Sequence, residues 1–160
     1  MKMSNATMSC NGTAEDRAAV MAIEHRIGTL ADPADVPPFY AGERAILYDA
    51  LMPGSVRGAD AICDAFAAQL VGTTSVSTEL EEHDLHISGD LAVLHSIQRL
   101  TVEREAGGSS EVVCRVTDVF ERDGDTWRIL HQHISYGIDP ATGKAIFFSP
   151  ATAQESQSTE

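Results

Sequence analysis

Residues 115–129 read RVTDVFERDGDTWRI, and this stretch predicts a hairpin of two antiparallel strands. Apolar residues recur at every second position on both sides of Asp123-Gly124-Asp125, which has the residue types of a tight turn. Asp118 lies at an alternate position between Val116 and Phe120. Because side chains on a strand alternate between its two faces, we expect Asp118 to be an acid on an otherwise apolar face.

Working outward, the same alternation predicts four long strands, at residues 76–87, 91–105, 111–122 and 126–138. The first half of the chain has helical spacing instead, which predicts helices over 14–31 and 59–71 with a short strand at 45–50 between them. Pro37-Pro38 allows at most a short turn before that strand. Helices followed by antiparallel strands indicate an α+β domain, in which N-terminal helices pack on one face of a curved antiparallel sheet.

The chain of 160 residues is the size of one domain. Its 43% hydrophobic and 22% charged residues are typical of a globular protein whose core can enclose a pocket. Only the two ends have little to bury. We therefore expect one domain over residues 13–150, flanked by disordered segments at 1–12 and 151–160.

Acidic residues outnumber basic ones, 24 to 11, which gives a net charge of −13. Phosphate backbones and anionic membranes repel such a chain, and no apolar run approaches the ~18 residues of a membrane-spanning helix. The N-terminus has no apolar stretch of signal-peptide length, and the three cysteines are too scattered for a disulfide framework. These features predict a cytoplasmic protein that binds neither nucleic acid nor membrane.

Neither face of the predicted strands is uniformly apolar or polar. In the last strand both alternate sets are mixed: Trp127, Ile129, His131 and His133 form one, and Arg128, Leu130, Gln132 and Ile134 form the other. A sheet covered by helices on one side and by a second subunit on the other has this pattern. We therefore expect a homodimer through the outer face of the sheet.

Three stretches together resemble the nuclear transport factor 2-like superfamily, whose cone-shaped, cystatin-like α+β fold is shared by ketosteroid isomerases, SnoaL-like polyketide cyclases and scytalone dehydratase. The first is ILYDALMPG at 46–54 with RGADAI at 57–62, and the second is the hairpin 115–129. The third is HQHIS at 131–135 with DPATGKA at 139–145. The resemblance covers about residues 14–150 and identifies a SnoaL-like or ketosteroid isomerase-like domain.

The resemblance to ketosteroid isomerases implies two carboxyl groups with different roles. Asp49, at the end of the first strand, matches the general base, and Asp118 matches the protonated acid that helps to hold the enolate oxygen. The family's tyrosine on the first helix has no counterpart, because the corresponding turn is Glu24-His25-Arg26. Two acids in one apolar pocket cannot both ionise cheaply, so one remains a base and the other a hydrogen-bond donor.

His131 and His133 are two positions apart, so both point to one side of a regular strand. By register with Asp118, the sequence predicts that this side is the cavity. Four roles remain open for the pair: acid–base catalysis, a polar lining of the pocket, a structural role and, together with a carboxylate, a metal site. Scytalone dehydratase uses histidines with an aspartate in the same fold, so the resemblance also leaves a dehydratase open. Of His83 and His86, at most one can enter the pocket.

These observations predict an enzyme that transfers a proton without a cofactor or metal, of isomerase or polyketide-cyclase type. Its substrate is expected to be an apolar carbonyl compound in a buried hydrophobic pocket. Asp49, Asp118, His131 and His133 are the predicted catalytic residues. The predicted substrate-binding residues are Glu24, Tyr48, Phe66, Val116, Phe120 and Trp127. The alternatives are a dehydratase with histidine as the acid–base group, and a non-catalytic module for ligand binding or dimerisation.

Overall fold

The computed structural model describes residues 12–29 and 32–146 of the chain. Two α-helices, α1 (Ala14–Ile27) and α2 (Ala59–Gln69), are joined by short elements. These are three 3-10 turns, η1 (Pro33–Asp35), η2 (Pro37–Phe39) and η3 (Gly42–Arg44), and two short strands, β1 (Ile46–Tyr48) and β2 (Val56–Arg57). The sequence predicts disorder at residues 1–12 and 151–160. These two segments, except for Gly12, lie outside the described residues.

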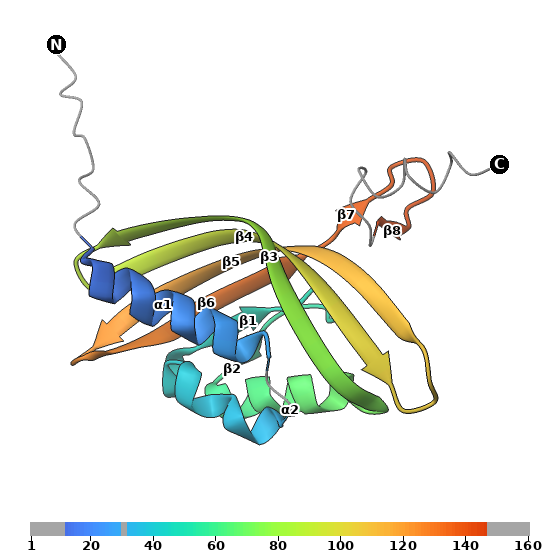
Figure 1. Ribbon diagram of the computed structural model, residues 1–160, viewed down its shortest axis with the longest axis horizontal. Coiled ribbons are helices and arrows are strands. Elements are labelled where there is room, and N and C mark those ends of the chain that lie inside the picture. The colour runs from blue at the N-terminus through green and yellow to red at the C-terminus, as the bar shows by residue number, and fades with distance from the viewer. Residues whose placement is uncertain (1–11, 30–31, 147–160) are drawn as a thin grey trace, which may run out of the picture.

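Four long strands follow as a meander, and a two-stranded hairpin ends the described chain. The long strands are β3 (Thr73–Ser88), β4 (Leu91–Arg104), β5 (Ser109–Asp123) and β6 (Thr126–Ser135), and the hairpin strands are β7 (Gly137–Ile138) and β8 (Ala145–Ile146). The main sheet has the order β2-β1-β6-β5-β4-β3 and is antiparallel except where β1 runs parallel to β6. Figure 1 shows the curved sheet with α1 and α2 on one side, which confirms the predicted α+β fold.

One carboxylate of the first helix joins its N-terminal cap to the sheet. Thr13 caps α1 by accepting a hydrogen bond from the N–H of Asp16 at 3.0 Å. Asp16 in turn accepts from the Trp127 indole N–H at 3.3 Å and pairs with Arg122 at 2.7 Å. The hydrogen bond from the Thr13 backbone is the main cause that lowers the pKa of Asp16. These contacts hold the N-terminal end of α1 against the sheet.

A β-bulge in β6 reverses the faces of its second half. Val119 pairs with His131 and Phe120 pairs with Ile129, so Leu130 is an extra residue in the ladder. Because one inserted residue shifts the alternation by one position, Gln132 and not His131 continues the buried face of Ile129. The prediction that His131 and His133 share the cavity face with Trp127 is therefore wrong.

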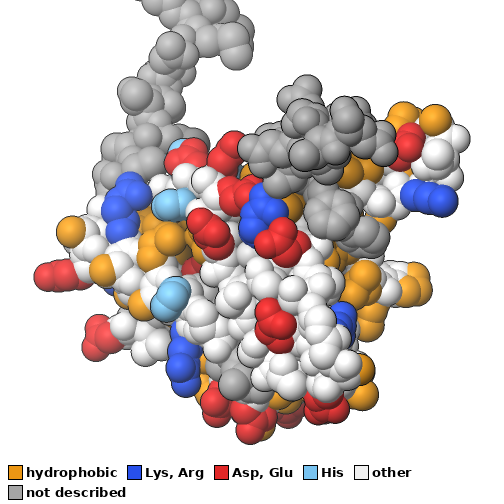
Figure 2. Space-filling view, turned by 45° about the vertical axis from the view of Figure 1, so that its right-hand side comes forward, with side chains coloured by type: hydrophobic (Ala, Val, Ile, Leu, Met, Phe, Trp, Pro, Cys, Tyr) orange, Lys and Arg blue, Asp and Glu red, His pale blue; other side chains and the backbone are white. Residues whose placement is uncertain are grey.

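The surface is acidic, as the net charge of −13 requires. Figure 2 shows acidic side chains spread over one face, with several gathered along its lower edge. Within residues 12–29 and 32–146 the structure contains no helix of the length and hydrophobicity needed to cross a bilayer.

The hydrophobic core lies between the helices and the inner face of the sheet. Phe120 is fully buried there beside Ile129 and Leu47. We expect Phe120→Ala to lower the free energy of unfolding by about 3–5 kcal/mol, because it removes buried contacts and leaves a cavity. The measurement is urea denaturation of the purified protein. Leu91→Ala, at a side chain that is 52% exposed, is the matched control and should cost less than about 1 kcal/mol. Equal losses in the two variants would contradict the assigned core.

Candidate active site

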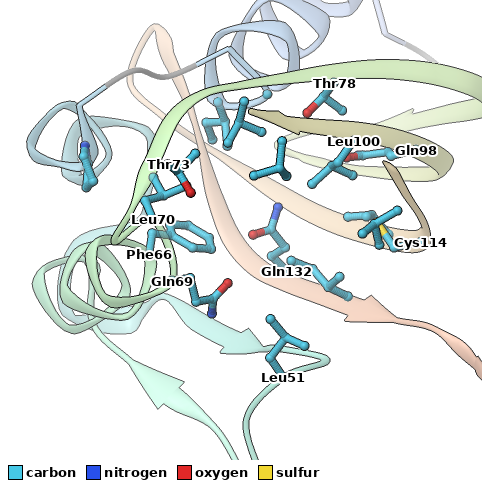
Figure 3. A pocket seen from close by; sticks show the side chains of 18 of the residues that line it. Leu51, Phe66, Gln69, Leu70, Thr73, Thr78, Gln98, Leu100, Cys114 and Gln132 are labelled. Atoms are coloured by element: carbon cyan, nitrogen blue, oxygen red, sulfur yellow. The ribbon is translucent and has the colours of Figure 1, made fainter. Parts of the chain in front are cut away.

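A cavity of about 270 Å³ opens between the two helices and the inner face of the sheet. Its walls are mostly apolar, and Figure 3 shows side chains from α2, the long strands and the loop after β1 directed into it. Six of these wall residues are Ile27, Phe66, Leu100, Val112, Cys114 and Ile134. A concave, mostly apolar site with a few polar groups is the usual form of a small-molecule site.

One group of polar side chains in the cavity surrounds Glu24. Glu24 of α1 is only 5% exposed, and its Oε1 accepts a hydrogen bond from Gln98 Nε2 at 2.5 Å. The same Gln98 nitrogen donates to Ser96 Oγ at 2.9 Å. Glu24, Gln98 and Gln132 line the cavity, so a carboxyl group and two amides face any ligand at this end.

Asp118 lies directly behind Glu24 and is fully buried. The two carboxyl groups interact, and burial together with the neighbouring charge of Glu24 holds the pKa of Asp118 well above its ordinary value. Burial also raises the pKa of Glu24. Within the described part of the chain, no donor reaches either Asp118 oxygen or Glu24 Oε2 with ordinary hydrogen-bond geometry. Two adjacent carboxylates cannot both stay ionised in an apolar interior, so we infer that a proton shared between the two carboxyls is the missing donor.

Tyr40 fixes the orientation of the second amide. The Tyr40 hydroxyl is buried and donates to Gln132 Oε1 at 2.8 Å. With its oxygen occupied, Gln132 directs its NH₂ group away from Tyr40. Gln132 is the cross-strand partner of Asp118, and its amide partly offsets the rise in the pKa of Asp118. The Gln132 NH₂ group is therefore a hydrogen-bond donor with a fixed orientation beside the carboxyl pair.

Asp49 is bound at the edge of the site. Its carboxylate accepts hydrogen bonds from the Leu51 N–H at 2.7 Å and from Gln69 Nε2 at 3.0 Å. Leu51 and Gln69 line the cavity, whereas Asp49 is not among the lining residues. The carboxyl group that raises the pKa of Asp118 belongs to Glu24 and not to Asp49. The structure therefore brings together Glu24 and Asp118, where the sequence predicted a pairing of Asp49 with Asp118.

His131, His133 and Tyr48 form a cluster outside the cavity. The ring of Tyr48, which is 43% exposed, meets the rings of His131 and His133 edge-on, at centroid distances of 4.8 and 5.8 Å. His131 Nδ1 lies 3.0 Å from the Ile46 carbonyl oxygen, so this nitrogen donates to the carbonyl. None of the three lines the cavity.

The other sequence-predicted residues divide between the wall and the core. Phe66 and Val116 line the cavity with Glu24, whereas Phe120 and Trp127 are buried in the core away from it. His83, His86 and His95 are also absent from the lining. Among the described residues no three His, Cys, Asp or Glu side chains gather closely enough to hold a metal ion. Burial raises the pKa of the Cys114 thiol to about 12, so this thiol in the wall stays protonated.

Three important residues escaped the sequence analysis. Gln98 lies two residues from both Ser96 and Leu100 in a predicted strand. The alternation of the strand therefore indicated that Gln98 shares their inner face. Gln132 was assigned to the opposite face because the bulge at Leu130 has no clear signal in the sequence. Tyr40 follows the double proline in an irregular segment, where no periodicity indicates which side chains are buried.

The family model of the SnoaL-like domain matches residues 38–139, more than half of the chain. No curated protein matches the sequence. Solved structures with the same fold include an NTF2-like protein of unknown function from Pseudomonas putida KT2440. It is 25% identical, with a TM-score of 0.70 over 89% of this chain and 99% of that chain.

Two neighbours have more specific names. A candidate dehydratase of the NTF2-like family from Streptomyces avermitilis is 14% identical, with a TM-score of 0.68 over 79% of this chain and 100% of that one. A candidate aromatic ring hydroxylase from Novosphingobium aromaticivorans is 16% identical, with a TM-score of 0.67 over 80% and 93%. At these identities the likeness shows the fold alone. With the match over residues 38–139, the chain belongs to the SnoaL-like domain family of the NTF2-like superfamily.

Proposed function

We propose that the protein is an enzyme that transfers a proton on a small apolar carbonyl compound without a cofactor, as isomerases and polyketide cyclases do. The observation that carries the proposal is the buried pair of Glu24 and Asp118 at the wall of an apolar cavity. Strongly perturbed carboxyl groups in a cleft are typical of acid–base catalysts.

In this proposal Glu24 takes the role of base that the family resemblance assigned to Asp49. Asp118 keeps the shared proton and donates a hydrogen bond to Glu24, and the Glu24 carboxylate takes a proton from a carbon next to the substrate carbonyl. The electron pair of the broken C–H bond moves to the carbonyl oxygen, where the Gln132 NH₂ group stabilises the enolate. Return of the proton to another carbon gives an isomer, and attack of the enolate carbon on a second carbonyl gives a ring.

The surroundings of the pair support this chemistry. The apolar walls exclude water, which strengthens the hydrogen bonds of the site and keeps an enolate from being quenched. The alternative of a dehydratase with histidine as acid–base group has less support, because His131 and His133 lie outside the cavity. One structural neighbour is named as a candidate dehydratase. Elimination of water that begins with proton removal by Glu24 belongs to the same reaction class.

We also propose that the outer sheet face joins two copies of the chain. Thr117 of β5 lies there between His95 and His133. Sedimentation analysis should therefore give a dimer for the wild type and a monomer for Thr117→Arg, because two buried guanidinium groups would face each other across the interface. Ser55→Arg, in the exposed loop after β1, is the control and should remain dimeric. A monomeric wild type would refute the interface.

The role of Glu24 is tested by exchange of substrate hydrogen for solvent deuterium. A panel of apolar ketones is incubated with the protein in D₂O, and incorporation next to the carbonyl is followed by NMR. We expect Glu24→Gln to slow exchange by about 10²–10⁴-fold, since the amide cannot accept the proton. Asp49→Asn should retain most of the activity.

Three results separate the competing functions. Exchange that survives Glu24→Gln but is lost in Asp49→Asn would return the role of base to Asp49. Loss of exchange in His133→Ala alone would favour a histidine lyase. A ketone that raises the melting temperature without any exchange would indicate a non-catalytic binding module.

The shared proton is tested through the pH dependence of stability. The folded state keeps a proton on the pair that the unfolded chain loses above about pH 4, so the pair stabilises the fold less as pH rises. As pH rises above about 4, the unfolding free energy of Asp118→Asn should therefore rise relative to that of the wild type, since the variant has no shared proton to lose. Urea denaturation across this range measures the difference.

Asp16 provides a control of opposite sign. Because the pKa of Asp16 is lowered in the fold, its carboxylate stabilises the protein above its ordinary pKa and loses that contribution in acid. Asp16→Asn should therefore be more destabilising at neutral than at acidic pH.

The shared proton would be contradicted if the difference in unfolding free energy between Asp118→Asn and the wild type did not change with pH.

A further inference from the structure

We propose that the cavity binds an elongated apolar molecule with a carboxylate at the end remote from Glu24, and that Arg104 binds this carboxylate. The inference names the substrate class of the proposed enzyme, and so rests on the proposed function for the reacting end. The anion site itself depends on separate observations at the other end of the cavity.

The cavity runs along two paired strands. On their inner face Gln98 pairs with Cys114, Leu100 with Val112, and Val102 with Ser110, and all six side chains line the cavity. Arg104 is the next inner residue of β4 after Val102 and lines the cavity too. The six residue-to-residue steps from Gln98 to Arg104 span about 20 Å of extended strand. The site is therefore long, with Glu24 near one end and Arg104 at the other.

Polarity along this path is divided between the two ends. Glu24, Gln98 and Gln132 occupy the first end, and Arg104, Thr73 and Ser110 occupy the second. The wall between them is mostly apolar, with Val76, Leu100, Val102 and Val112, and Thr78 is a polar side chain in it. A ligand that matches this pattern has an apolar body and polar groups at both ends.

Arg104 is equipped to bind an anion. It is the only cationic side chain of the cavity wall, and Glu24 the only acidic one, among the lining residues of the described chain. Its Nη1 donates to Thr73 Oγ1 at 3.1 Å, and no carboxylate within residues 12–29 and 32–146 pairs with it. Arg99, on the outer face of the same strand, differs in this respect because it pairs with Glu81 and Glu111. The free N–H groups of Arg104 fit a carboxylate in a two-point contact.

The backbone holds Arg104 in place at this end. Its N–H donates to the Gly108 carbonyl at 3.1 Å, and the N–H of Glu105 donates to the Gly72 carbonyl at 3.0 Å. Gly107 and Gly108 have φ angles of 85° and 87°, which disfavour any other residue in this turn. The turn is thus tied to the start of β3. The net charge of −13 favours a singly charged carboxylate over a polyanion.

The experiment compares a carboxylate with its neutral amide by isothermal titration calorimetry at low ionic strength. Decanoate should bind the wild type roughly tenfold more tightly than decanamide, because a charge-assisted contact replaces a neutral one. Arg104→Gln should remove this preference while leaving decanamide affinity unchanged. Arg57→Gln removes the same charge at an exposed position outside the cavity and should retain the preference.

Three results would overturn the inference. They are equal affinity of the wild type for decanoate and decanamide, a preference for decanoate that survives in Arg104→Gln, and no binding of hexanoate, decanoate or tetradecanoate. Deuterium exchange keeps this test separate from that of the proposed function. If Arg104→Gln loses the preference for decanoate but the wild type shows no deuterium exchange, the anion site is supported and the proposed enzyme activity is rejected.

Discussion

The contact between Glu24 and Asp118 is the constraint on which the site depends. Burying two acids side by side costs free energy, and two glutamine amides beside them lower this cost, as does the shared proton that we infer. The helix, the middle of the sheet and the irregular segment around Tyr40 all contribute to this arrangement. A change in any of these three elements therefore alters the acidity of the pair.

The architecture could be predicted from sequence because it follows from local patterns. Two-residue alternation and Gly-rich turns located the four long strands, and helical spacing located α1 and α2 to within a few residues. Long-range pairing left no such local pattern. The parallel pairing of β1 with β6 joins segments far apart in the chain, and the break at Tyr136 between β6 and β7 interrupts a segment that alternation alone extends to Ile138.

The site could be predicted only in part, for reasons that differ among residues. Asp118 was found because an acid on an apolar strand face is unusual. Glu24 was named as a wall residue, but its pairing with Asp118 depends on where α1 crosses the sheet, to which long-range contacts of Asp16 and Arg17 contribute. The histidines were assigned to the wrong face because a single inserted residue at Leu130 inverts everything after it.

The parallel pairing of β1 with β6 also has a consequence for how the chain folds. His131 and the Ile46 carbonyl are 85 residues apart in sequence, whereas neighbouring strands from β3 to β6 are joined by short turns. Contacts of such high sequence separation require a large loop to close, so they form late and slowly. We therefore expect the meander to assemble first as a hairpin array, and the loop after β1 that carries Leu51 to the cavity to reach its place later. Because Gln132 and Ile134 of β6 line the cavity, a nascent chain lacks part of the cavity wall until β6 has been synthesised.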